Sequence, residues 1–128
     1  MATNSGTVKS EGKKAMLEHL LDLAYFELQA REDENLSVTL SSEEVTFDNP
    51  TLTSDDYYID LSSNCELVIA TGKTVGEIRL YAGANSSSTS LYATANISAT
   101  GENDFPNGGS LIVTKFEIKV IWWKIKLK

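Results

Sequence analysis

The chain has 128 residues, a length that fits one domain with a sizeable core. Hydrophobic residues make up 41% and charged residues 23%, which argues against a disordered chain, and no apolar run approaches the roughly 20 residues that a membrane helix needs. The net charge of −7 disfavours broad nucleic-acid binding, because phosphates repel an acidic protein.

The first residues are small and polar and lack the basic start and apolar stretch of a secretory signal, so we expect synthesis in the cytoplasm. Residues 1–9 are predicted to be a flexible arm. A helix is predicted over residues 10–23, because Ser10 can cap its start and Glu11 falls in its first turn. The apolar positions of this segment recur at helical spacing: Ala15, Met16, Leu17, Leu20, Leu21 and Leu23.

From residue 25 onward, apolar residues recur at every second position, as on half-buried strands. Residues 65–70 are apolar nearly throughout, as a strand covered on both faces would be. Polar turns such as Asp48-Asn49-Pro50 separate the strands. About eight short strands, spaced about ten residues apart, predict a mainly β fold. We expect a jelly-roll-like antiparallel β-sandwich over residues 10–121, with the short N-terminal helix included and a barrel as the alternative.

The C-terminal segment breaks its own pattern. Up to Trp122 one set of alternating positions is apolar, but from Trp123 the apolar set moves by one residue. Such a slip implies a bulge or a break, so residues 122–128 are predicted to be a strand extension that pairs with a neighbouring subunit. The alternative is a strand that bends at a bulge and closes its own barrel.

Basic residues gather near the two ends of the chain, where eight of the eleven lie. Between residues 15 and 110 there are only three basic residues against sixteen acidic ones. The basic ends could meet the acidic bodies of neighbouring copies, and solvated surface charge is the alternative. The predicted partner interface consists of Trp122, Trp123, Lys124, Ile125, Lys126, Leu127, Lys128 and Lys9.

No catalytic, metal or cofactor site is predicted. Cys65 and His19 are the only residues of their types, which excludes an internal disulfide and the common zinc sites, and Cys65 is expected to be a buried small hydrophobe. The acidic pair Glu43-Glu44 would face opposite sides of a strand, and Glu102-Asn103-Asp104 lacks the spacing of an EF-hand. We therefore expect a protein without enzymatic activity.

Aromatic residues offer one alternative function, because sugars stack on exposed rings. A carbohydrate-binding module could use Tyr57, Tyr58, Tyr81, Tyr92, Trp122 and Trp123. Packing in the core or at a subunit interface is the default for aromatic residues on strands.

Several segments, taken in order, resemble small structural proteins of bacteriophage virions. The similar segments are a helix start of the type Gly-Lys-x-Ala-Met-Leu at 12–17, the strand 25–28, Val-Gly-x-Ile-x-Leu-Tyr at 75–81, the small-residue loop 82–90 and the glycine turn into a strand at 107–113. The similarity covers about residues 10–120. The basic aromatic end lies outside this pattern, and Gln29-Ala30 stands where the family commonly has His-Thr.

The resemblance implies a non-enzymatic component of the virion. We expect a capsid decoration (cement) protein that forms a homo-oligomer, with a trimer favoured, and binds the major capsid protein or other virion proteins. A tail, neck or fibre-adaptor subunit is the alternative. Neither nucleic acid nor membrane is an expected partner.

Overall fold

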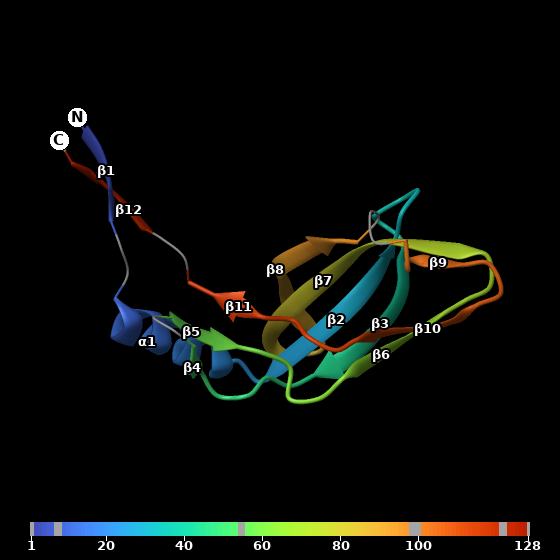
Figure 1. The fold of residues 1–128 in the computed structure, drawn as a ribbon, viewed down its shortest axis with the longest axis horizontal. Helices are drawn as coiled ribbons and strands as arrows, with labels where there is room; N and C mark the ends of the chain where they lie inside the picture. The colour runs from blue at the N-terminus through green and yellow to red at the C-terminus, as the bar shows by residue number, and fades with distance from the viewer. Residues whose placement is uncertain (1, 7–8, 54–55, 98–100, 121–122, 128) are drawn as a thin grey trace. The chain divides into compact units, whose positions relative to one another are not determined.

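The computed structural model describes residues 2–6, 9–53, 56–97, 101–120 and 123–127 (Figure 1). Strands account for 55% of the structure and all described strand pairs are antiparallel, so the prediction of a mainly β chain with one N-terminal helix is confirmed. The described elements are β1 (Ala2–Gly6), α1 (Ser10–Leu21), β2 (Tyr25–Glu32), β3 (Thr39–Val45), β4 (Thr51–Thr53), β5 (Asp56–Ile59), β6 (Cys65–Ile69), β7 (Lys73–Asn85), β8 (Ser88–Asn96), β9 (Asp104–Phe105), β10 (Gly109–Val113), β11 (Ile118–Lys119) and β12 (Trp123–Leu127).

The chain divides into two compact units, whereas the sequence predicts one domain over residues 10–121. The first, the terminal unit, contains Met1–Asp22, Phe47–Asp60 and Phe116–Lys128. The second, the sheet unit, contains Leu23–Thr46 and Leu61–Lys115. Each unit is therefore assembled from segments that are distant in sequence.

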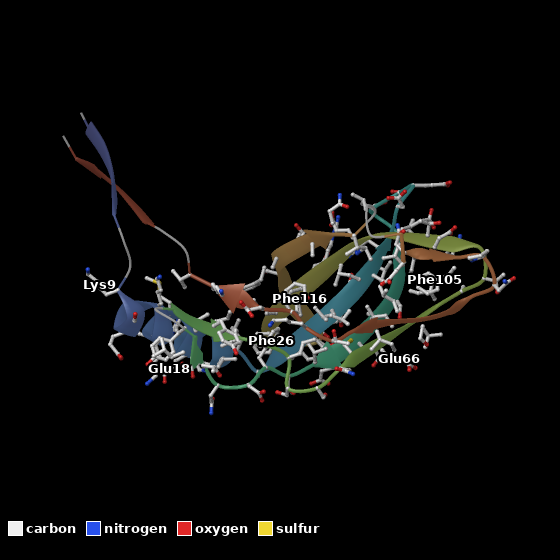
Figure 2. The ribbon with its side chains drawn as sticks, viewed as in Figure 1. Lys9, Glu18, Phe26, Glu66, Phe105 and Phe116 are labelled. Carbon is white, nitrogen blue, oxygen red and sulfur yellow. The ribbon has the colours of Figure 1, made fainter. Side chains whose placement is uncertain are left out.

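The sheet unit is built on four strands that lie side by side in the order β3-β2-β7-β8 (Figure 1). On β2, the apolar residues Phe26, Leu28 and Ala30 are buried while the residues between them are half-buried. Register pairs Leu28 directly with Leu80 on β7, so the buried positions of the two strands share one face. The alternation predicted from the sequence is confirmed here, and Figure 2 labels Phe26 on this face.

A second pair of strands, β6 and β10, completes the sheet unit. Along β6, Cys65, Leu67 and Ile69 are buried, but Glu66 and Val68 are exposed. The expectation that this strand is covered on both faces is therefore wrong, because Val68 is 60% exposed. β6 lies next to β3 and β2, and its approach is fixed by a hydrogen bond of 2.9 Å from the Ser62 amide to the Thr46 carbonyl.

In the terminal unit, α1 packs against β5, which pairs with β4 and β11. The helix is confirmed, and Leu17 of its predicted apolar stripe is buried, but Ala15 and Met16 of that stripe are exposed and Lys13 is buried. Its N-cap is Lys9, which makes no side-chain capping bond, rather than Ser10. The spacing of four between the buried residues is helical, so only the orientation of the helix was misjudged.

The β7–β8 hairpin depends on a glycine, which gives the first testable prediction. A Cβ at Gly83 would lie 1.8 Å from the carbonyl oxygen of Ser88, a distance that forces the backbone to move. We expect Gly83→Ala to lower the free energy of unfolding by more than about 1 kcal/mol, measured by urea denaturation. Ala84→Ser, an exposed neighbour, is the matched control and should stay within about 0.5 kcal/mol of the parent. An unchanged Gly83→Ala midpoint would show that this close approach does not exist.

Candidate interaction surfaces

The C-terminal strand that the sequence singles out is β12, and its partner lies in the same chain. β12 pairs antiparallel along its whole length with β1, from Ala2 opposite Leu127 to Gly6 opposite Trp123. The sequence predicts a flexible arm at 1–9 and a neighbouring subunit as the partner of β12. In the structure Ala2–Gly6 is a strand, and it pairs with one edge of β12. We call this two-stranded sheet the terminal ribbon.

The sequence of β12 alternates apolar and basic residues. Trp123, Ile125 and Leu127 alternate with Lys124 and Lys126, and register pairs all five with small or polar residues of β1. β11 ends at Lys119, and the predicted slip at Trp122-Trp123 begins at a residue outside the described ones, so the break stays a prediction.

Not every predicted interface residue can be placed. Trp122 and Lys128 lie outside the described residues. Lys9 is exposed at the start of α1, in the terminal unit. Within the described part of the chain β12 pairs only with β1, and isolated two-stranded ribbons are marginally stable in water. The terminal ribbon thus has an open edge at which another strand could add.

A second surface is the polar face of the sheet formed by β2 and β7. The Tyr25 hydroxyl donates a hydrogen bond of 2.7 Å to Glu27 Oε1, and Gln29 Nε2 donates to the other oxygen of the same carboxylate. Arg31 Nη2 donates to Gln29 Oε1 at 2.5 Å. Four alternate residues of β2 are therefore joined in one line across the face of the sheet.

Tyr81 connects this line to β7. Its hydroxyl accepts hydrogen bonds from Arg31 at 2.7 Å and from Arg79 at 3.4 Å, and the Arg31 guanidinium lies 5.5 Å from the centre of its ring. Arg79 is also paired with Glu77. These side chains compensate one another in charge, although Arg31 Nε is buried without a hydrogen-bond partner among the described residues.

This network is not predictable from the sequence, because its members come from two separate segments. Alternation predicts that Glu27, Gln29 and Arg31 share a face, but not which strand lies beside them. In the structure Gln29 stands opposite Arg79, and Glu27 opposite Tyr81. The sequence signal for this network is complementary charge on two alternating segments. It can be recognised only when the register between the two strands is known.

A third feature is a hollow of about 250 Å³ between β3 and β6. Its lining includes Cys65, which is buried as predicted. Burial raises the pKa of this thiol, and the negative charge of Glu43 raises it further, so the thiol stays protonated at neutral pH and is a poor nucleophile. The residues that line the hollow are Glu43, Glu44, Val45, Thr46, Ser63, Asn64, Cys65, Glu66 and Val68.

The tyrosines are divided between the two units, with Tyr57 and Tyr58 in the terminal unit and Tyr81 and Tyr92 in the sheet unit. Tyr57 and Tyr58 are consecutive on β5 and so face opposite sides, and the ammonium of Lys14 lies 5.7 Å from the centre of the Tyr57 ring. Tyr81 is half-buried in the polar network, whereas Tyr92 is exposed on β8.

Asn103, in the acidic segment 102–104, has a structural role. It is buried, and its side-chain amide donates a hydrogen bond of 2.8 Å to the Val75 carbonyl. Across the described ranges no group of three or more His, Cys, Asp or Glu residues could hold a metal ion. No described helix is long and apolar enough to cross a membrane.

Comparison with protein-family models, with curated proteins and with solved structures gave no match. The three surfaces must therefore be interpreted by their own chemistry.

The polar line on β2 can be tested through Tyr25. Its hydrogen bond to Glu27, followed by burial and the negative charges of Glu27 and Glu44, raises the pKa of Tyr25 from 10.0 to about 12. We expect Glu27→Gln to lower this pKa toward 10, measured by the ultraviolet absorbance of tyrosinate, with Tyr25→Phe identifying the transition. Because the folded-state pKa is raised, the stabilisation is present below pH 10 and is lost as the pH rises toward 12. Tyr25 titrating at 10 in the parent would contradict the hydrogen bond.

The link between β2 and β7 can be measured with a double-mutant cycle. Arg31→Met and Tyr81→Phe each remove one partner of their hydrogen bond, and the coupling between them should be about 0.5–1.5 kcal/mol in the free energy of unfolding. Arg31→Met with Tyr92→Phe, an exposed tyrosine, is the control pair and should be additive. Additivity in both pairs would mean that Arg31 and Tyr81 do not interact.

Proposed function

We propose that this chain is a non-enzymatic structural protein of a bacteriophage virion, a capsid decoration protein that strengthens the head lattice. The observation that carries the proposal is the terminal ribbon, which has an open edge within the described residues and in whose strand β12 three apolar residues alternate with two lysines. This is an arrangement suited to adhesion between chains. The resemblance of residues 10–120 to small virion proteins points the same way.

The proposal includes a small β-sandwich as the body of the protein. The buried residues of β6 and those of β2 and β7 would form its two inner faces, with the polar network of Arg31 and Tyr81 on the outside. Half-buried side chains joined by hydrogen bonds restrict one another's conformations. A rigid outer face suits a protein that sits on a lattice and does not move.

Decoration would work by burying apolar surface at the joints of the lattice. Each square ångström removed from water contributes roughly 25 cal/mol before the costs of association. A homo-oligomer, which we propose to be a trimer, multiplies this contribution, because each copy brings its own contacts to the same joint. The partner would be the major capsid protein.

A tail, neck or fibre-adaptor subunit would use the same ribbon and is the second proposal within the virion. The two roles differ in number, because decoration proteins cover the lattice whereas tail and neck parts occur in low multiples. We do not propose a carbohydrate-binding module, because two of its candidate tyrosines, Tyr57 and Tyr81, are engaged by cationic side chains.

The copy number of the chain in purified particles tests the proposal. We expect quantitative mass spectrometry of particles from the phage that carries this sequence to find the chain at a level comparable with the major capsid protein. Negative-stain images with a labelled antibody should place it on the head. A few copies at the tail or neck would overturn the decoration role in favour of the second proposal, and its absence from particles would overturn both.

A further inference from the structure

The hollow between β3 and β6 is bounded by two open strand edges. β3 is the outer strand of the five-stranded sheet, in which β9 also pairs with β7, and β6 is paired only with β10 in the described residues. The segments that carry β3 and β6 are joined by the hydrogen bond from the Ser62 amide to the Thr46 carbonyl. Beyond that bond, no ladder of backbone hydrogen bonds connects β3 to β6 in the described part of the fold. The hollow is therefore a place where a further strand could take hydrogen bonds from an existing edge.

The chemistry of the hollow restricts which strand could enter it. Three glutamates line it, the lining residues include neither lysine nor arginine, and Val68 adds an exposed apolar side chain; Glu66 is labelled in Figure 2. Glu43 stands opposite Leu28 in register, so it lies on the apolar face of the sheet at its edge. A charge in this position protects an edge strand against nonspecific pairing with other strands. A neutral strand would leave Glu43 without water and without a partner, which is costly.

One described strand has the complementary composition. β12 has five residues, as β6 has, and it contains Lys124 and Lys126 but no acidic residue. Its apolar residues alternate with the lysines, and one of its edges is unpaired in the described residues. The two lysines match the glutamates of the hollow in charge, and the apolar residues match Val68.

From these observations we propose that β12 of one copy adds to the open edge of β3 in the hollow of a second copy of this chain. The contact is head-to-tail, since the strand and the hollow are different surfaces, and such contacts form closed rings when the rotation between copies allows it. Glutamates exclude uncharged strands, and the lysines supply both steering and the missing counter-charges. The inference stands apart from the virion role, because it concerns assembly of the purified chain alone.

The experiment is a charge exchange between two full-length variants. In the first variant, Glu43→Lys and Glu66→Lys make the hollow basic; in the second, Lys124→Glu and Lys126→Glu make the strand acidic. Each variant alone would then bring like charges together, and we expect its self-association to weaken about tenfold or more. In an equimolar mixture every contact between unlike copies pairs opposite charges, so alternating assemblies, which are open chains or rings with an even number of copies, should form again. The measurement is molar mass by light scattering after size-exclusion chromatography at low salt, over a range of concentrations.

Matched controls and outcomes make the test decisive. Glu18→Lys and Glu34→Lys reverse exposed charges outside the hollow and should leave assembly unchanged. Circular dichroism establishes that each variant is folded, and recovery in the mixture excludes misfolding as the cause of a loss. A parent chain that is monomeric at all concentrations, variants that assemble like the parent, or a mixture that fails to assemble while both variants are folded would each overturn the proposal. A chain that assembles as proposed but is missing from virus particles would contradict the proposed function alone.

Discussion

The register of β2 between β3 and β7 is the constraint on which the sheet unit depends. Leu28 stands opposite Leu80, and both are fully buried. A shift of β2 by one residue would move these side chains to the outer face and bring Glu27 and Gln29 into the core. The same register that buries the leucines also brings Arg31 within reach of Tyr81. The apolar core and the outer polar network are therefore two results of one pairing.

The edge strand of this sheet differs from the central strands in how its backbone groups are satisfied. β2 and β7 are paired on both sides, so their backbone groups are satisfied by neighbours. β3 is paired on one side only in the described residues, and it carries Glu43 on its apolar face and Glu44 on its polar face. Charges at an edge prevent unselective association. They also make the edge selective, since lysines in an added strand compensate these negative charges and an uncharged strand does not.

Local patterns in the sequence predicted the elements well where side-chain periodicity decides the structure. The alternation in residues 25–30 predicts the buried positions of β2 correctly, because one face of that strand is covered and the other is not. The same kind of reasoning failed on residues 65–70, since the apolar Val68 is exposed. An apolar side chain on a strand does not say that another layer covers it. For α1 the helix was predictable, but its buried face was not, because Lys13 is buried beside Leu17.

Features that depend on pairing between segments distant in the chain could not be predicted from the sequence. The hollow forms because Thr46 and Ser62 are joined after an excursion of the chain through β4 and β5. No periodicity in either segment indicates that they meet. The strand β1 was not predicted for the same reason, because Thr3 is the one β-branched residue of Ala2–Gly6 and none of its residues is aromatic. Its strand conformation comes from the pairing itself.

The pairing of β1 with β12 has a consequence for how the molecule is made. β1 precedes every other described element and β12 follows every other, so the ribosome delivers β1 long before its partner. β1 waits without its partner while the sheet unit is synthesised, and closing so long a loop delays the ribbon further. Any contact made by β12 is postponed with it. The order of synthesis therefore separates folding of the sheet unit from the formation of contacts with other chains. This order protects nascent chains on the same polysome from premature association.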